Sequence, residues 1–168
     1  LADAAVLAPV IPRSKVVCVG KNYHDHAAEM GGVAPQEPLL FLKPNTAVIG
    51  PGDVIVRPTL SDQTEYEGEL AVVIGRRAYN VSEAEALEYV FGYTILNDVS
   101  ARTIQNQHKQ WYRGKSLDGF TPMGPWIVTP DEFDVRRPWK IQSRVNGELR
   151  QDSTTDLMIF HVPYVIAE

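Results

Sequence analysis

Glycine and proline interrupt this sequence at short, irregular intervals, and this is the strongest constraint on its fold. The chain has 168 residues, of which 12 are glycine and 12 are proline. The apolar stretches between them, such as residues 14–20, have the length of strands rather than of long helices. Asn146-Gly147 lies between two alternating runs and predicts a two-residue hairpin turn. The pattern predicts many short strands with short helices at 82–92 and 101–111.

The composition is that of an ordinary globular protein built as one domain. Hydrophobic residues make up 44% of the chain and charged residues 22%. The formal net charge of −5 argues against nucleic acid as a partner, because no basic surface is available to displace counterions from phosphates. The single cysteine, Cys18, excludes an internal disulfide and is expected in a buried strand. No apolar segment has the length of a membrane span, so we expect no membrane partner and a cytoplasmic location.

Three glutamates alternate along the predicted strand 64–75, "TEYEGELAVVIG". Side chains at every second position of a strand share a face, so Glu65, Glu67 and Glu69 would repel one another. Solvent, basic side chains or a hard cation could relieve that repulsion. Asp98 follows the next apolar strand, and three carboxylates from two strand ends suit Mg²⁺ or Mn²⁺. A merely solvated acidic face is the alternative, and the chain has no Cys/His spacing typical of zinc.

Six blocks occur in an order that resembles the fumarylacetoacetate hydrolase family. They are "GKNYHDHAAEM", "FLKP", "EYEGELAVVIG", "NDVSAR", "WYRGKSLDGFTPMGP" and "RVNGELRQDSTTDLMIF". The blocks look most similar to the branch that includes acylpyruvate hydrolases, oxaloacetate decarboxylases and hydroxyheptadienedioate isomerases. The resemblance covers nearly the whole chain, and the order of six blocks makes it specific.

The resemblance implies a β-rich α+β fold, a mixed β-sandwich roll with short flanking helices. Residues 1–14 are then a lead-in, and residues 15–168 form the catalytic domain. The family has a glycine-rich loop after its last helix, so we expect this domain to lack its C-terminal end. A homodimer is also expected. The implied cofactor is Mg²⁺ or Mn²⁺, with Ca²⁺ as a possible substitute in crystals, and the implied ligands are Glu67, Glu69 and Asp98.

The resemblance also implies the residues that carry out the reaction. His26 and Glu29 match a histidine–glutamate dyad that activates water, and they would share one face of a helix. Lys115 matches the lysine of the active site, where its ammonium stabilises developing negative charge. The residues implied to bind substrate are Lys43, Arg102, Gln105, Asp118 and Thr121.

The expected activity is metal-dependent hydrolytic C–C cleavage of an acylpyruvate-type substrate, a small 2-oxo or 2,4-dioxo acid, through an enolate. Two alternatives stay open. The first is an isomerase or decarboxylase acting on 2-hydroxyhepta-2,4-dienedioate or oxaloacetate in aromatic or keto-acid catabolism. The second is a metal-binding domain without turnover.

Overall fold

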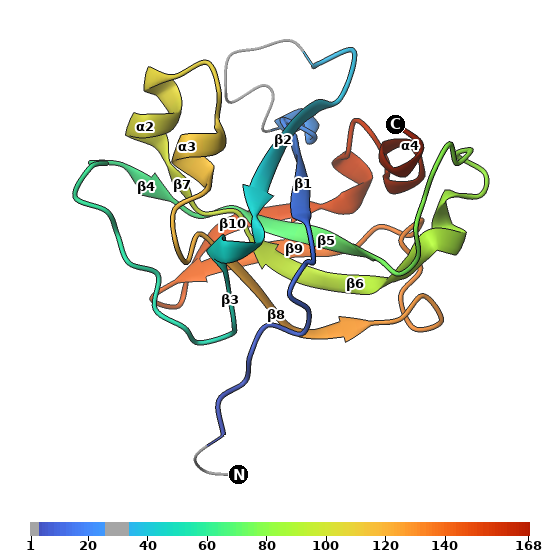
Figure 1. Ribbon diagram of the computed structural model, residues 1–168, viewed down its shortest axis with the longest axis horizontal. Coiled ribbons are helices and arrows are strands. Elements are labelled where there is room, and N and C mark those ends of the chain that lie inside the picture. The colour runs from blue at the N-terminus through green and yellow to red at the C-terminus, as the bar shows by residue number, and fades with distance from the viewer. Residues whose placement is uncertain (1–3, 26–33) are drawn as a thin grey trace. The chain divides into compact units, whose positions relative to one another are not determined.

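The computed structural model describes residues 4–25 and 34–168 (Figure 1). The chain divides into two compact units. The first contains Leu1–Cys18, Phe41–Leu70 and Thr94–Ile127, and the second contains Val19–Leu40, Ala71–Tyr93 and Val128–Glu168.

Ten strands dominate the described residues and form four sheets. One sheet has four strands in the order β3-β8-β6-β5, and the pairs β1-β2, β4-β7 and β9-β10 form the others. β3 is parallel to β8, whereas β4-β7 and β9-β10 are antiparallel. The predicted β-rich α+β class is therefore confirmed. The strands are β1 (Lys15–Gly20), β2 (Leu39–Pro44), β3 (Val48–Ile49), β4 (Thr64–Glu65), β5 (Gly68–Ile74), β6 (Val90–Asn97), β7 (Ser100–Ala101), β8 (Thr121–Val128), β9 (Lys140–Val145) and β10 (Glu148–Thr154).

The helices of the described residues are all short. They are α2 (Arg102–Gln107), α3 (Tyr112–Lys115) and α4 (Val162–Ala167), with 3₁₀ turns η1 (Asn45–Ala47), η2 (Ala86–Tyr89) and η3 (Thr155–Leu157). The helix predicted at 101–111 is confirmed in its first half by α2. No helix in the described part of the chain is both long and apolar enough to cross a membrane.

The long strand predicted over residues 64–75 is broken in the structure. β4 ends at Glu65 and β5 begins at Gly68. Between these strands, the backbone of Glu67 bonds to the end of β6 and the residue after it. The Glu67 amide donates to Asn97 Oδ1 at 3.1 Å, and the Asp98 amide donates to the Glu67 carbonyl at 2.8 Å. The prediction of one continuous strand was wrong because these side-chain and loop bonds replace the regular ladder.

The prediction of a helix over residues 82–92 was also wrong. Ser82 and Glu85 do make the expected contact, with the Ser82 hydroxyl donating to Glu85 Oε2 at 2.6 Å. The chain nevertheless forms only the short η2 turn and enters β6 at Val90. Aromatic and β-branched residues from Tyr89 onward favour a strand, and sheet pairing overrides the local capping signal.

The second unit contains the predicted hairpin and an aromatic stack. Asn146 and Gly147 connect β9 to β10 with φ values of 52° and 83°, as the two-residue turn requires. Phe133 lies between Tyr93 and Trp139, with ring centroids 4.7 and 4.5 Å away. These rings pack against one another within this unit, whereas most residues of the hairpin strands are exposed.

The first unit contains a small core of buried apolar residues. Val99, Ala101, Ile104 and Phe120 are buried together, and Leu117 packs against them. The Val99 amide donates to the Phe120 carbonyl at 3.2 Å, which ties the chain after β6 to the start of β8. This core fixes the backbone on both sides of the segments that carry Asp98, Arg102 and Lys115.

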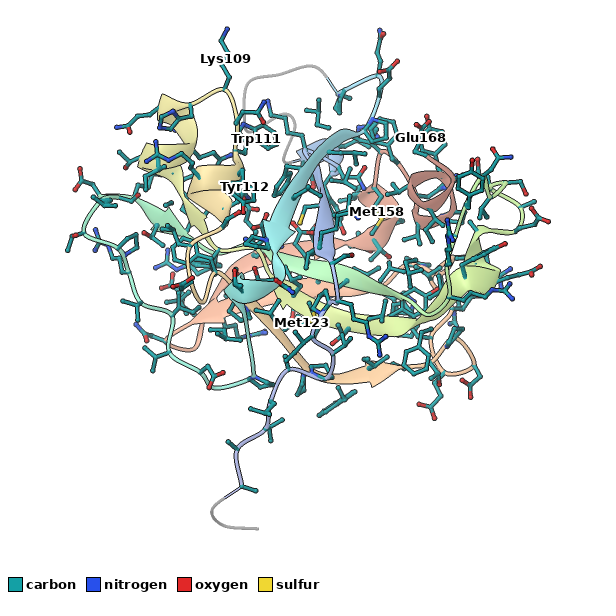
Figure 2. All side chains as sticks on the ribbon, viewed as in Figure 1. Lys109, Trp111, Tyr112, Met123, Met158 and Glu168 are labelled. Carbon is teal, nitrogen blue, oxygen red and sulfur yellow. The ribbon has the colours of Figure 1, made fainter. Side chains whose placement is uncertain are left out.

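Helices α2 and α3 lie side by side in Figure 1, and Gly114 of α3 lies close against Gln105 of α2. A Cβ atom at Gly114 would lie 2.7 Å from Gln105 Cβ and 2.8 Å from the Gln105 amide nitrogen. Trp111, labelled in Figure 2, precedes α3 and packs edge-on against Phe41 with ring centroids 5.6 Å apart. Any side chain at position 114 must therefore push α3 away from α2.

We expect Gly114→Ala to lower the free energy of unfolding by about 1–3 kcal/mol, because the added methyl group overpacks a rigid contact. Urea denaturation measures the change. Gly147→Asn is a suitable control, since nothing lies within 4 Å of its Cβ position and asparagine tolerates the left-handed conformation. A Gly114→Ala variant as stable as the wild type would contradict the close approach of α2 and α3.

Candidate active site

A cluster of acidic and basic side chains lies within the first unit and contains most of the predicted site residues. Lys43 comes from the end of β2, Glu67 from the break between β4 and β5, and Glu69 from the start of β5. Asp98 follows β6, Arg102 and Gln105 belong to α2, and Lys115 ends α3. Segments distant in sequence thus contribute to one charged site.

Two lysines surround Asp98. Lys115 Nζ lies 2.6 Å from Asp98 Oδ2 and 2.7 Å from Glu67 Oε2, so one ammonium bridges two carboxylates. Lys43 Nζ lies 2.6 Å from Asp98 Oδ1 and also donates to the Lys115 carbonyl at 2.5 Å. The Lys43 side chain is completely buried, and Lys115 Nζ lies 5.3 Å from the centre of the Phe41 ring. These ammonium groups are desolvated and held in fixed positions.

Arg102 makes the second set of ionic contacts. Its Nε donates to Glu65 Oε2 at 2.7 Å, and its Nη1 donates to Gln105 Oε1 at 2.9 Å. Its Nη2 donates to Glu67 Oε1. Glu67 therefore pairs with Arg102 through one oxygen and with Lys115 through the other.

Burial and charge shift the pKa values of these groups in different directions. Burial raises the pKa of Asp98 even though Lys115 and Lys43 oppose that shift. Burial alone would also raise the pKa of Glu67, but Lys115 and Arg102 together lower it. Burial lowers the pKa of Lys43 against the opposing charge of Asp98.

Glu69 is the exception among the carboxylates. Burial, followed by the negative charges of Glu67 and Asp98, raises its pKa to about 8. Among the ion pairs of the described residues, none involves Glu69, whereas Lys115 and Arg102 are engaged by its neighbours. Four carboxylates thus face only three cationic side chains, so the ionised form of Glu69 has no cationic partner among the described residues.

The donor set fits a hard divalent cation. Glu67, Glu69 and Asp98 supply only carboxylate oxygens, the ligands that Mg²⁺ and Mn²⁺ prefer, and the ionised form of Glu69 has no cationic side chain to pair with among the described residues. In the part of the chain that the structure describes, no three acidic, histidine or cysteine side chains are already arranged around one point as ligands. Lys115 lies between Glu67 and Asp98, so an ion held by the three carboxylates would share these two side chains with the lysine.

The remaining predicted residues take no part in these ion pairs or lie outside the described chain. Asp118 is exposed, and the ion pairs of the nearby Lys115 are made with Glu67 and Asp98. Thr121 is completely buried at the start of β8, and its hydroxyl finds no hydrogen-bond partner among the described residues. His26 and Glu29 lie outside the described residues. The substrate-binding role of Asp118 and Thr121 and the dyad therefore stay predictions.

Sequence reasoning missed two residues that shape the site. Asn97 was read only as part of the "ND" block, yet its side-chain oxygen holds the Glu67 amide. Glu65 was left outside the ligand set and given no other role, yet it pairs with Arg102. Two sequence signals could have indicated these contacts. Asn97 is an uncharged amide directly before the expected ligand Asp98, and Glu65 is an acid two residues before the expected ligand Glu67.

Comparison with known proteins identifies the family. Residues 15–168 match the family model described as fumarylacetoacetate (FAA) hydrolase C-terminal. Oxaloacetate tautomerase YisK of Bacillus subtilis is 45% identical, over 99% of this chain and 56% of its own length.

Two solved structures are also similar. A 5-carboxymethyl-2-hydroxymuconate delta-isomerase from Mycobacterium smegmatis is 50% identical with a TM-score of 0.88, over 99% of this chain and 65% of that chain. A fumarylacetoacetate hydrolase from Exiguobacterium antarcticum is 48% identical with a TM-score of 0.87, over 96% of this chain and 58% of that chain.

The chain thus spans between 56% and 65% of the length of these three proteins. The match to the family model covers all elements from β1 to α4, including every residue of the charged cluster. The resemblance inferred from the six sequence blocks is confirmed, and this chain belongs to the fumarylacetoacetate hydrolase family.

Proposed function

We propose that this chain carries the catalytic site of a divalent-metal-dependent enzyme that moves protons between the keto and enol forms of small 2-oxo dicarboxylic acids. The observation that carries the proposal is the bridging position of Lys115, whose ammonium contacts both Glu67 and Asp98. Desolvated cations beside hard oxygen ligands are suited to stabilise an enolate. The similarity to two relatives named as a tautomerase and an isomerase supports this class of reaction.

A divalent ion such as Mg²⁺ or Mn²⁺, held by Glu67, Glu69 and Asp98, would act as a Lewis acid on the 2-oxo group of the substrate. Lys115 would donate a hydrogen bond to the oxygen on which negative charge develops. Lys43 would keep Lys115 in place, because it bonds to both Asp98 and the Lys115 carbonyl. Arg102 and Gln105 offer groups for the substrate carboxylates.

Keto–enol interconversion then needs only proton movements. A base takes one proton from C3 of the 2-oxo acid, and a proton is delivered to the C2 oxygen, so that no bond between heavy atoms breaks. We assign the base to His26, oriented by Glu29, on the strength of the matched sequence block alone. Lys115 or solvent would supply the proton to oxygen.

Hydrolytic cleavage of an acylpyruvate is the second candidate. It is favoured by the similarity to the protein of Exiguobacterium antarcticum that is named a fumarylacetoacetate hydrolase. In that reaction His26 would deprotonate water, the resulting hydroxide would attack the distal carbonyl, and the C–C bond would break to leave an enolate stabilised beside Lys115. The same charged cluster would serve both reactions, so an assay must separate them.

The test follows the ultraviolet absorbance of enol oxaloacetate with Mn²⁺ present. We expect the wild-type protein to accelerate ketonisation well above the buffer rate, and Lys115→Met to lower that rate about 100-fold through lost stabilisation of the enolate. Glu148→Gln is the control, because Glu148 is an exposed residue paired with Arg150 on β10. Cleavage of acetylpyruvate without ketonisation would assign hydrolysis, and inertness towards both acids would contradict the enzyme proposal.

The metal ligands are tested with Glu69→Gln. We expect this variant to bind Mn²⁺ at least tenfold more weakly in calorimetry, because one anionic ligand becomes a neutral amide. Above pH about 8, where Glu69 is ionised, the metal-free variant should be at least as stable as the wild type to heat, since it no longer buries an unpaired charge. A variant with unchanged Mn²⁺ affinity would remove Glu69 from the ligand set.

The raised pKa of Glu69 predicts a pH dependence of stability without metal. The folded state holds a proton on Glu69 up to pH about 8, whereas the unfolded state releases it near the ordinary value of 4.5. The folded state therefore binds more protons in this window, and the contribution of Glu69 to stability falls as pH rises from 4.5 to 8. Urea denaturation across this range should show a steeper fall for the wild type than for Glu69→Gln. Equal slopes would contradict the assignment.

A further inference from the structure

The three nitrogens of the Arg102 guanidinium each donate a hydrogen bond to a different partner. Nε bonds to Glu65, Nη1 to Gln105 and Nη2 to Glu67. Both Arg102 and Gln105 are buried, so the hydrogen bond between them lies away from solvent. The Glu65 side chain is 40% exposed, whereas that of Glu67 is 17% exposed. Glu65 therefore binds Arg102 from the solvent side and Glu67 binds it from within.

Glu65 is itself held firmly by the backbone around it. It belongs to β4, where it pairs with Ser100 of β7, and the Arg102 amide donates to the Gln63 carbonyl at 2.9 Å. The Gln63 side-chain amide donates to the second oxygen of Glu65. These bonds fix the Glu65 carboxylate relative to the start of α2, which is the element that carries Arg102.

The two acids compete for one cation. If Glu65 were absent, the whole charge of Arg102 would be available to Glu67, and the Arg102–Glu67 pair would tighten. A divalent cation needs the same Glu67 carboxylate, and an anionic ligand needs the same Nη1 and Nη2 groups. A residue that draws the guanidinium away from Glu67 through Nε would therefore help both of them. Arginine can divide its bonds in this way because its donors point along fixed, separate directions.

We propose that Glu65 is a positioning residue that anchors Arg102 through Nε, so that Nη1 and Nη2 can exchange Gln105 and Glu67 for an anionic group of the substrate. The proposal rests on the proposed function, which places a 2-oxo acid and a divalent ion beside Glu67. Glu65 itself touches neither. It acts through the orientation of Arg102, and it keeps that side chain neutralised when Glu67 turns to the ion.

Binding of oxalate, the smallest dicarboxylate that imitates the 2-oxo acid end, tests the anchor without requiring turnover. Calorimetric titrations with Mn²⁺ present would compare wild type, Glu65→Ala and Glu65→Gln. Alanine removes both charge and acceptor, whereas glutamine keeps an acceptor for Nε. We expect oxalate affinity to fall about tenfold in Glu65→Ala and less in Glu65→Gln. Glu148→Gln removes the acid of another Glu–Arg pair, in which the nitrogen and oxygen lie 2.8 Å apart, and should leave the oxalate affinity within twofold of the wild-type value.

Two further readouts separate positioning from general damage. The Arg102 Nε–H resonance should move upfield in Glu65→Ala, because its hydrogen bond to a carboxylate is lost. With a substrate that the wild type turns over, KM should rise about tenfold while kcat changes less than threefold.

Unchanged oxalate affinity in Glu65→Ala, or no oxalate binding by the wild type, would overturn the proposal. A wild type that binds oxalate but converts no 2-oxo acid would instead overturn the proposed function, and the Glu65 variants would still decide the role of the anchor.

Discussion

The pairing of Lys115 with Glu67 and Asp98 is the interaction on which the described site depends. Removing one member of a buried ion pair leaves an uncompensated charge in a medium that solvates it poorly, and the loss is typically about 3–5 kcal/mol. Lys43 extends the pairing, because it contacts Asp98 and the carbonyl of Lys115 together. The positions of β2, α3 and the end of β6 are thereby linked through charged atoms as well as through the apolar core formed by Val99, Ala101, Ile104 and Phe120.

This pairing is incomplete by one cationic side chain, and we relate the imbalance to the divalent ion proposed above. Glu69 stands beside Glu67 and Asp98 without an ion pair of its own among the described residues, and its pKa rises to about 8. A site selected only for stability would replace such a group with a neutral one. A site that must receive a divalent cation benefits from the extra negative charge. The free-energy cost of ionising Glu69 without a metal is therefore the physical counterpart of the cation affinity that we propose.

The sequence predicted which side chains lie together in the charged cluster better than it predicted the backbone that carries them. Alternation in "TEYEGELAVVIG" correctly suggested acids that lie near one another, and the order of the sequence blocks selected Lys43, Asp98 and Lys115, which the structure brings together. Alternation could not reveal the break at Tyr66-Glu67, because the break depends on bonds to Asn97 and Asp98, 30 or more residues away. Local patterns contain no information about such distant partners.

The same limit explains the error over residues 82–92. Ser82 and Glu85 make their local contact as predicted, but a capping interaction contributes only about 1 kcal/mol. The pairing of β6 within the four-stranded sheet outweighs it from Val90 onward. The hairpin at Asn146-Gly147 was predictable because its determinant is local: both residues adopt the positive φ values that few other residue types tolerate.

The broken strand also gives Glu65 and Glu67 different environments. On one regular strand the two side chains would have shared a face and the same environment. Because β4 ends at Glu65, that residue remains in a small antiparallel pair with β7, half exposed, while Glu67 turns toward Lys115. Arg102 lies on the helix that follows β7 and can reach both. The break thus converts two repelling carboxylates into an anchor and a candidate metal ligand joined by one guanidinium, an arrangement that neither a continuous strand nor a lysine at position 102 would provide.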